Sequence, residues 1–231
     1  VHEKWDINSG ILSGDAMLIL AYQYFENYPP VTFQKLAQLF SKTAIEVCDG
    51  QQLDVDFETR NDVSIEEYIK MISLKTSVLI GAALKMGAIV SEASEKDAAI
   101  LYDFGLNLGI AFQLQDDYLD TYGNPETFGK QVGGDIIENK KTYLYLKALE
   151  LASTEDKKLL HEFYQSKLED NKEKIMLVKQ VFDTYQIPVL IKVLINEYSQ
   201  KAFSVLGNIN ISEEAKNGLH QFGKALMTRK V

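Results

Sequence analysis

The stretch GLNLGIAFQLQDDYLDTYG, residues 105–123, joins a run of apolar and small residues to three aspartates and then to a loop. Ser94 and Asp97 form a helix-start pattern, which predicts one helix running from there into the aspartates. On that helix Asp116 and Asp120 project from one face, whereas Asp117 points about 100° away. Carboxylates at this spacing repel each other and the negative end of the helix dipole. The stretch therefore predicts an acidic helix end that is stabilised by a cation.

The residues around this stretch indicate which cation and which anion it would meet. Mg²⁺ is commonly coordinated by carboxylate oxygens and substrate phosphate oxygens at the same time. It therefore fits the paired acids. The following loop, about residues 121–139, contains Gly123, Gly129, Gly133 and Gly134 with Lys130, Lys140 and Lys141 nearby. Glycines and lysines beside metal-binding acids are suited to a diphosphate. Upstream, Lys75 and Thr76 interrupt an apolar helix, and Gln113 can point an amide oxygen into the same space. The alternatives are a solvated helix end and a Lys75 side chain that simply reaches solvent.

The other periodic segments have the helical period, so we predict an all-α protein without internal repeats. Pro29 and Pro30 end a first helix, and Ser64 with Glu67 forms a capping box that opens a long one. The segment VLIKVLI resembles a strand, but its neighbours favour helix. The predicted helices are 11–25, a stripe from Leu36 to Val47, 64–91, 94–120, 140–152, 155–168, 171–185, 187–206 and 212–227.

Two of these helices, 64–91 and 94–120, are rich in small residues, including Gly81, Gly105 and Gly109. Glycine inside a helix costs roughly 1 kcal/mol against alanine, so these positions indicate close approach of a backbone or a ligand. We favour helix packing over a ligand. Both helices are expected inside the fold.

Composition excludes several classes of protein. The chain has 231 residues, 46% of them hydrophobic, and only four prolines, which favours one continuous domain over residues 1–231. A net charge of −9 without a lysine or arginine stripe argues against nucleic acid. One cysteine, Cys48, forms no internal disulfide, and three scattered histidines give no zinc spacing, so a reducing, cytoplasmic location is expected. The longest apolar stretch, 78–90, is too short to span a membrane and contains Lys85.

Several motifs together resemble one known family. GIAFQLQDDYLDTYG, followed by GK, GGDI and NKKT, strongly resembles the second aspartate-rich region of the trans-isoprenyl diphosphate synthases, the polyprenyl synthetase family. ISLKTSVLIGAALKMGAI resembles its Lys-Thr helix, DGQQLDVDFE its Gly-Gln segment, and VHEKWDINSGILSGDAML the stretch after its first aspartate-rich motif. The resemblance covers residue 1 to about 150 and, less distinctly, the remainder. In the family a first DDxxD and an arginine pair lie just upstream of the position of Val1, so a chain of these residues alone is expected to be inactive.

The resemblance implies a fold and an activity. The fold would be a single helical bundle of the isoprenoid synthase type around a central cavity, with N-terminal helices that are missing here. The activity would be a Mg²⁺-dependent head-to-tail condensation of isopentenyl diphosphate with an allylic diphosphate, giving a longer trans-prenyl diphosphate of the farnesyl or geranylgeranyl class. A homodimer is expected, and the residues do not decide the product length.

The resemblance also implies roles for individual residues. Asp116 and Asp120 resemble magnesium ligands that bridge to the allylic diphosphate, and Asp117 supports them. Thr76 and Gln113 resemble oxygens that face the developing carbocation. The residues expected to bind the diphosphate are Lys75 and Lys130, with Lys140 as a weaker candidate and Arg229 and Lys230 as a basic tail that closes the site. Released diphosphate would take the final proton, which leaves His2, His161 and His220 as bystanders.

Three other interpretations stay open at this point. A non-catalytic subunit of a heteromeric prenyltransferase would share the fold, although such subunits tend to lose acidic motifs. A terpene cyclase would use the same ionisation chemistry, but GKQVGGDI and NKKT favour chain elongation. A helical scaffold without a ligand would leave the paired acids and the lysine loop unexplained.

Overall fold

The computed structural model describes residues 1–124, 132–165 and 171–228, and within them the chain forms helices and no strand. The all-α prediction is therefore confirmed for the described part of the chain. The helices are α1 (Ile7–Gln23), α2 (Pro30–Thr59), α3 (Ile65–Ile72), the π-helical turn η1 (Ser73–Ser77), α4 (Val78–Val90), α5 (Glu95–Tyr122), α7 (Gly134–Ile137), α8 (Tyr143–Leu151), α9 (Thr154–Gln165), α10 (Asn171–Thr184), α11 (Ile187–Leu206) and α12 (Glu213–Thr228).

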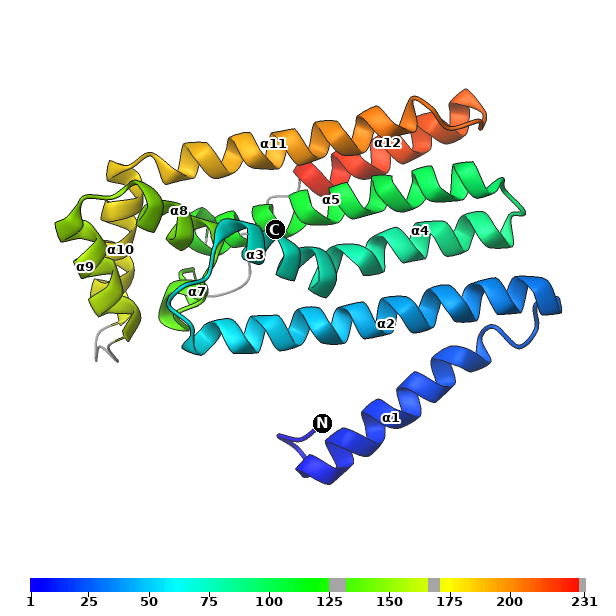
Figure 1. The fold of residues 1–231 in the computed structure, drawn as a ribbon, viewed down its shortest axis with the longest axis horizontal. Coiled ribbons are helices and arrows are strands. Elements are labelled where there is room, and N and C mark those ends of the chain that lie inside the picture. Colours follow the sequence, from blue (N-terminus) through cyan, green and yellow to red (C-terminus); the bar gives the residue numbers. More distant parts are fainter. Residues whose placement is uncertain (125–131, 166–170, 229–231) are drawn as a thin grey trace.

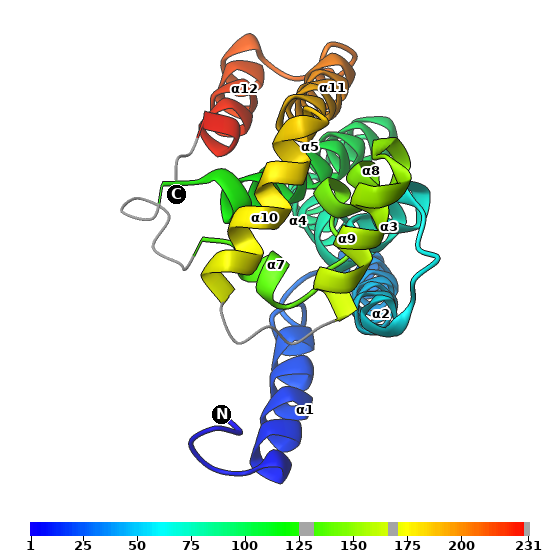
Figure 2. The same ribbon diagram turned by 90° about the vertical axis from the view of Figure 1, so that its left-hand side faces the viewer.

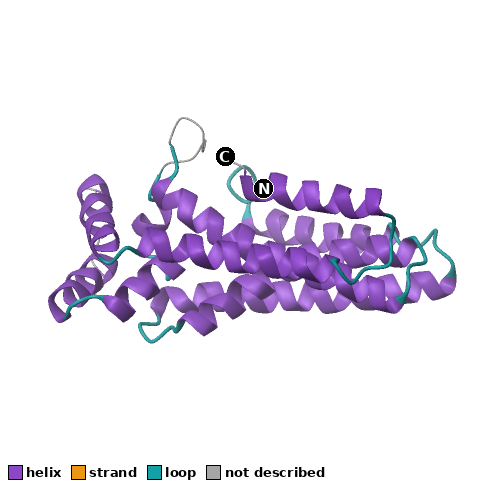
Figure 3. Ribbon diagram, turned by 90° about the horizontal axis from the view of Figure 1, so that it is seen from above, coloured by secondary structure: helices purple, strands orange, loops and turns teal. Residues whose placement is uncertain are grey.

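The long helices α2, α4, α5 and α11 run roughly side by side along the longest axis of the molecule (Figure 1). Helix α5 lies between α4 and α11, and its contacts with these two helices are the most extensive in the molecule. The shorter helices α8, α9 and α10 gather at one end of the bundle (Figure 3). Helix α1 projects away from the other helices (Figure 2) and has no buried residue. The chain therefore carries its aspartate-rich segment on a central helix.

Capping signals place the starts of α3 and α5 correctly. The side chain of Ser64 accepts the backbone N–H of Glu67, and the Glu67 carboxylate accepts that of Ser64, which confirms the capping box. Ser94 caps α5 by accepting the N–H of Asp97. The prolines were predicted to end the first helix, but α1 already ends at Gln23. Pro30 is instead the first residue of α2, a position at which a backbone N–H would have no hydrogen-bond partner within the helix.

The small residues serve helix packing, as predicted. A Cβ atom on Gly105 would lie 2.8 Å from the Cα atom of Gly81, and one on Gly109 would lie 2.7 Å from the Cα atom of Ser77. These glycines therefore let α5 approach α4 and η1 at backbone distance. Phe104 of α5 is fully buried with Leu108, Ala202 and Leu206, so it packs in the core between α5 and α11.

Some boundaries differ from the prediction. The segment predicted as loop, 121–139, contains the last two residues of α5 and the short helix α7, while residues 125–131 lie outside the described part. The helical stretch Ile65–Val90 is longer than the apolar run 78–90, and by length and hydropathy it meets the criteria of a membrane span. It lies against α2 and α5, and about a third of its most apolar part, 33%, is buried in the bundle.

Candidate active site

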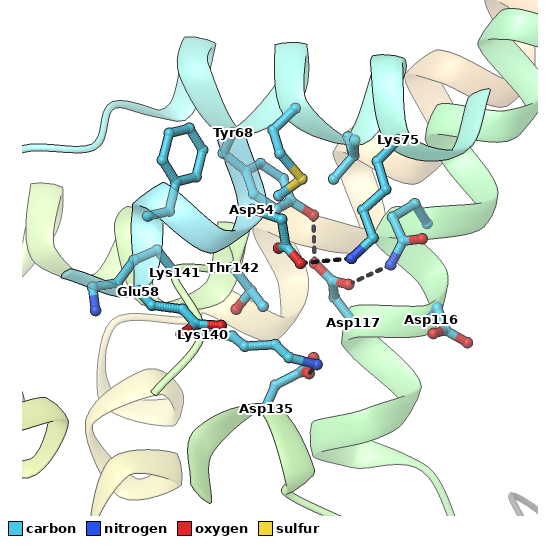
Figure 4. A pocket seen from close by; sticks show the side chains of 14 residues that line it. Asp54, Glu58, Tyr68, Lys75, Asp116, Asp117, Asp135, Lys140, Lys141 and Thr142 are labelled. Atoms are coloured by element: carbon cyan, nitrogen blue, oxygen red, sulfur yellow. Dashed lines mark hydrogen bonds and ion pairs between the residues drawn. The ribbon is translucent and has the colours of Figure 1, made fainter. Parts of the chain in front are cut away.

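A pocket of about 270 Å³ opens beside the C-terminal half of α5 (Figure 4). Helices α2, α3 and α5, the turn η1, and the segment from α7 to α8 all contribute side chains to it. The lining residues are Asp54, Phe57, Glu58, Tyr68, Met71, Ile72, Lys75, Gln113, Asp116, Asp117, Asp135, Lys140, Lys141 and Thr142. Segments far apart in the sequence thus bring carboxylates and ammonium groups to one cavity.

Lys75 enters the pocket from η1, where the helix widens into a π-helical turn. Such turns are rare and occur often at functional sites. The Nζ atom of Lys75 lies 2.6 Å from Oδ2 of Asp54, which extends from α2. Gly50, one turn before Asp54, permits this approach, because a Cβ atom there would lie 2.3 Å from the backbone nitrogen of Lys75. Helix α2 therefore fixes both the backbone and the side chain of Lys75.

A chain of hydrogen bonds connects η1 to α5 and α3. The Thr76 hydroxyl donates to Oε1 of Gln113 at 3.2 Å, and Nε2 of Gln113 donates to Oδ1 of Asp117 at 3.0 Å. The buried hydroxyl of Tyr68 donates to the other oxygen of Asp117. Asp117 thereby orients the Gln113 amide, whose oxygen faces Thr76.

The acidic side chains of the site lie close together and are partly or fully buried, and several of them have raised pKa values. Burial, together with repulsion from Asp135, raises the pKa of Asp117 to about 8, although hydrogen bonds from Tyr68 and Gln113 oppose the shift. Burial and Asp135 likewise raise the pKa of Asp120 to about 6. Burial also raises the pKa of Asp135 itself. These carboxylates lack sufficient positive charge around them.

Asp135 and Lys140 form the far side of the pocket (Figure 4). The Nζ atom of Lys140 lies 3.0 Å from Oδ1 of Asp135 and 3.0 Å from Oε2 of Glu138. Partial burial disfavours the ammonium charge, yet the two carboxylates outweigh it and raise the pKa of Lys140. Lys140 is therefore positively charged at neutral pH and lies beside the acidic cluster.

The structure brings most of the predicted residues together. Lys75, Gln113, Asp116, Asp117 and Lys140 line the pocket, and the hydroxyl of Thr76 binds Gln113. The three histidines do not line it. The predicted residues Lys130, Arg229 and Lys230 lie outside the described part of the chain.

Asp117 and Asp120 differ in their position relative to the pocket. Asp117 lines the cavity, whereas Asp120 is not among the lining residues. Instead, Oδ2 of Asp120 accepts the backbone N–H of Asp135 at 2.9 Å, and its carbonyl accepts that of Gly133 at 2.6 Å. Asp120 thus holds the turn that presents Asp135 to the pocket.

Among the pocket residues that were not predicted as site residues, Asp54, Tyr68 and Asp135 bind predicted ones: Lys75, Asp117 and Lys140 respectively. Asp54 and Asp135 belong to motifs quoted for the resemblance, DGQQLDVDFE and GGDI, so a signal for them was present. No sequence signal marked Tyr68 as a site residue, because a buried aromatic residue on the core face of α3 is ordinary.

The donor set fits Mg²⁺. Buried carboxylates with raised pKa values gain free energy from a cation, and Mg²⁺ commonly uses one or two carboxylates together with waters and phosphate oxygens. Within the described residues, no group of three or more His, Cys, Asp or Glu side chains is arranged so that it could hold a metal ion by itself.

The fold and the pocket place the chain in a known structural class. A crystal structure of a geranylgeranyl pyrophosphate synthase matches it with a TM-score of 0.94 at 51% identity, over 100% of this chain and 72% of that one. The geranylgeranyl pyrophosphate synthetase of Pyrococcus horikoshii matches with a TM-score of 0.89 at 31% identity, over 99% and 69%. The chain therefore has the all-helical isoprenoid synthase fold.

The comparison of sequences identifies the family. The model of the Polyprenyl synthetase family matches residues 1–181. A short chain isoprenyl diphosphate synthase of Methanothermobacter thermautotrophicus is 41% identical over 69% of this chain and 50% of its own length. A geranylgeranyl diphosphate synthase of Sulfolobus acidocaldarius is 34% identical over 91% of this chain and 64% of its own length. The chain belongs to the polyprenyl synthetase family, and it spans about half to two thirds of the length of these relatives.

Proposed function

We propose that the protein condenses isopentenyl diphosphate head-to-tail with an allylic diphosphate, in a Mg²⁺-dependent reaction, to give a longer trans-prenyl diphosphate of the farnesyl or geranylgeranyl class. One observation carries the proposal: the pocket combines Lys75, Lys140 and the Thr76–Gln113–Asp117 chain with a crowded set of carboxylates. The names of the relatives, short chain isoprenyl and geranylgeranyl diphosphate synthases, support the same reaction class.

The lysines would bind the diphosphate of the allylic substrate. Lys75 and Lys140 lie on different sides of the cavity and are partly exposed, so both reach an entering anion. Each is now paired with a carboxylate, Asp54 or Asp135, which holds its ammonium in place. Charged hydrogen bonds from ammonium groups to diphosphate oxygens stabilise the leaving group as the carbon–oxygen bond breaks. Lys130, from the loop outside the described residues, is a further proposed diphosphate ligand.

Asp116 and Asp120 are the proposed Mg²⁺ ligands, and Asp117 supports them through its bonds to Gln113 and Tyr68. When bound there, Mg²⁺ would neutralise the diphosphate charge and make it a better leaving group.

The remaining pocket residues would manage the carbocation. The electron pair of the broken bond leaves with the diphosphate, and the double bond of isopentenyl diphosphate forms the new carbon–carbon bond. Gln113 lines the cavity, and its Oε1, together with the Thr76 Oγ1 that binds it, would present partial negative charge toward the cationic carbon. Phe57, Met71 and Ile72 give the cavity an apolar wall that disfavours water, which would otherwise trap the cation. The released diphosphate takes the final proton.

The acidic set favours this reaction over a non-catalytic subunit. A non-catalytic subunit would gain nothing from carboxylates whose pKa values are raised. A bound cation would explain why Asp117 and Asp120 carry a charge that their surroundings disfavour.

The test is an elongation assay with the intact protein. Isopentenyl diphosphate, Mg²⁺ and allylic diphosphates of increasing length are incubated with it, and the products are separated by size. We expect a product longer than the allylic substrate. Failure to extend every allylic diphosphate would refute the proposal.

We also propose a homodimer, in which α1 packs against a second copy. The apolar side chains of α1 are exposed: Ile7 72%, Leu12 67%, Met17 69% and Ile19 65%. Near its C-terminal end α1 contacts α2 through Tyr22 and Phe40, whereas its remaining apolar surface is uncovered. Exposed apolar residues in such number on one helix mark an interaction site, and we propose that a second copy covers part of them.

A further inference from the structure

Asn139 lies directly before Lys140 in the segment that forms the far side of the pocket. Its φ angle is +60°, in the left-handed region that residues other than glycine seldom adopt, although asparagine tolerates it better than most. This conformation persists only where the surroundings hold it. The contacts of Asn139 therefore decide where the neighbouring Lys140 points.

Two buried lysines hold Asn139. Lys174, from α10, is 2% exposed, and its Nζ atom donates to Oδ1 of Asn139 at 2.5 Å and to the carbonyl of Ile137 at 3.5 Å. Lys141 is 7% exposed, and its Nζ atom donates to the carbonyl of Asn139 at 3.2 Å. Both ammonium groups also lie over the ring of Tyr164, at 5.5 and 5.8 Å from its centre. Both oxygens of Asn139 are thus bound by ammonium groups.

This arrangement is unfavourable for a purely structural core. Burying an ammonium group is costly, and an apolar side chain of similar volume often replaces a buried charge without loss of stability. Burial lowers the pKa of both Lys141 and Lys174. Lys174 does not line the pocket, so the proposed reaction gives it no direct role.

The bonds beyond Asn139 lead into the site. The backbone N–H of Lys140 donates to the carbonyl of Asp135 at 2.9 Å, and its Nζ atom pairs with Oδ1 of Asp135 at 3.0 Å. A fixed Asn139 therefore fixes both the backbone and the ammonium of Lys140 relative to Asp135. We propose that Lys174 is a positioning residue, which acts through Asn139 to aim Lys140 at the diphosphate; this inference rests on the proposed function.

The test is a double-mutant cycle of Lys174→Met with Lys140→Ala in the intact protein. Lys174→Met is expected to raise KM for the allylic diphosphate roughly 10-fold, the scale on which supporting contacts act, with a much smaller change in kcat. In the Lys140→Ala background the same change is expected to have no further effect, because its route to the substrate is gone. The thermal midpoint is expected to stay the same or rise, since methionine fills the space without a buried charge.

Two further variants sharpen the cycle. Asn139→Gly keeps the backbone conformation but removes the Oδ1 acceptor, so it is expected to raise KM as Lys174→Met does, without adding to it. Lys158→Met removes an exposed ammonium from α9 and is the matched control, with unchanged KM. An unchanged KM in Lys174→Met, or an equal effect in both backgrounds, overturns the inference.

Different experimental results would refute the positioning role of Lys174 and the proposed function. If the unsubstituted protein extends no allylic diphosphate, the proposed function is wrong, and a crystal structure of Lys174→Met then judges the positioning role. Displacement of Lys140 from Asp135 supports the role. A Lys140 Nζ atom that still lies 3.0 Å from Asp135 Oδ1 overturns it.

Discussion

At the scale of single residues, Asp117 shows most clearly what the pocket is built for. It is 4% exposed, accepts hydrogen bonds from Tyr68 and Gln113, and still has a pKa of about 8. An ordinary aspartate has a pKa near 3.9. The folded protein therefore holds this carboxyl in an environment that disfavours its charge, and a cation in the pocket would reverse that preference.

This environment predicts an unusual pH dependence for the metal-free protein. Above about pH 4 the unfolded chain has lost the Asp117 proton, whereas the folded protein keeps it until about pH 8. The folded state binds more protons, so the Asp117 contribution to stability falls as the pH rises through this window. We expect Asp117→Asn, which carries no charge, to gain stability over the unsubstituted protein between about pH 5 and 8. Urea unfolding in the presence of a chelator measures the difference, and a pH-independent difference would contradict the account.

Lys75 gives a direct test of diphosphate binding. Lys75→Met removes the ammonium that Asp54 holds in the pocket, so kcat/KM is expected to fall by about 10- to 100-fold, the scale of one lost charged hydrogen bond. Lys85→Met is the control, because Lys85 lies on the adjoining helix α4 and does not line the pocket. Equal effects of the two substitutions on steady-state kinetics would refute a specific role for Lys75.

At the scale of elements, the π-helical turn η1 and the glycine opposite it work as one unit. The turn carries Lys75 and Thr76, and α2 approaches it closely only because residue 50 is glycine. The same principle operates at Gly105 and Gly109, which seat α5 against α4 and η1. Small residues thus set the distances of α2 and α5 from η1 and the distance of α5 from α4.

Glycine substitutions separate close packing from helix propensity. Gly50→Ala places a Cβ atom 2.3 Å from the Lys75 nitrogen, so the free energy of unfolding is expected to fall by about 1–3 kcal/mol and the affinity for diphosphate to fall with it. Gly87→Ala, in α4, meets no atom within 4 Å and is expected to stabilise by roughly 0.5–1 kcal/mol. Chemical denaturation checks both. A neutral Gly50→Ala would show that α2 and η1 are not coupled as described.

Elements whose signals are local were predictable from the sequence, and those that depend on tertiary contacts were not. The capping box of Ser64 and the helical period of residues 187–206 appear within a few neighbouring residues, and both are confirmed. The π-helical turn is different, because no pattern in its own residues marks it, and the segment that packs against it, at Gly50, lies about 25 residues earlier in the chain. Likewise Asp116 and Lys75 stand out as polar residues in apolar helices, whereas Asp54 and Tyr68 gain meaning only once folding places them beside Lys75 and Asp117.

At the scale of the whole molecule, the pocket is assembled by packing rather than by one motif. Helices α2, α3 and α5 and the segment after α7 converge at the same end of the bundle, where α8, α9 and α10 support them from outside (Figures 1 and 4). Helix α1 takes no part in this assembly and stands off from the bundle with its apolar side chains exposed. The pocket and the exposed helix α1 are therefore separate features of the molecule.

The exposed face of α1 predicts the effect of added charge on the oligomer. Leu12→Glu combined with Ile19→Glu places carboxylates on surface that a second copy would bury, and this is expected to convert the proposed dimer to a monomer. Glu155→Lys, an exposed change on α9, is the control and should leave the mass unchanged. Sedimentation velocity measures the mass; a doubly substituted protein that stays dimeric would place the interface elsewhere.

The account depends most on the claim that the acids and lysines of the pocket ionise an allylic diphosphate. The most direct measurement is the rate at which the intact protein converts an allylic diphosphate and isopentenyl diphosphate into a product longer by one isopentenyl unit, compared with its Asp116→Ala variant. The account predicts this product in the presence of Mg²⁺ and a loss of rate of several orders of magnitude in the variant, which retains its fold by circular dichroism. An Asp116→Ala variant that elongates at the unsubstituted rate would contradict it.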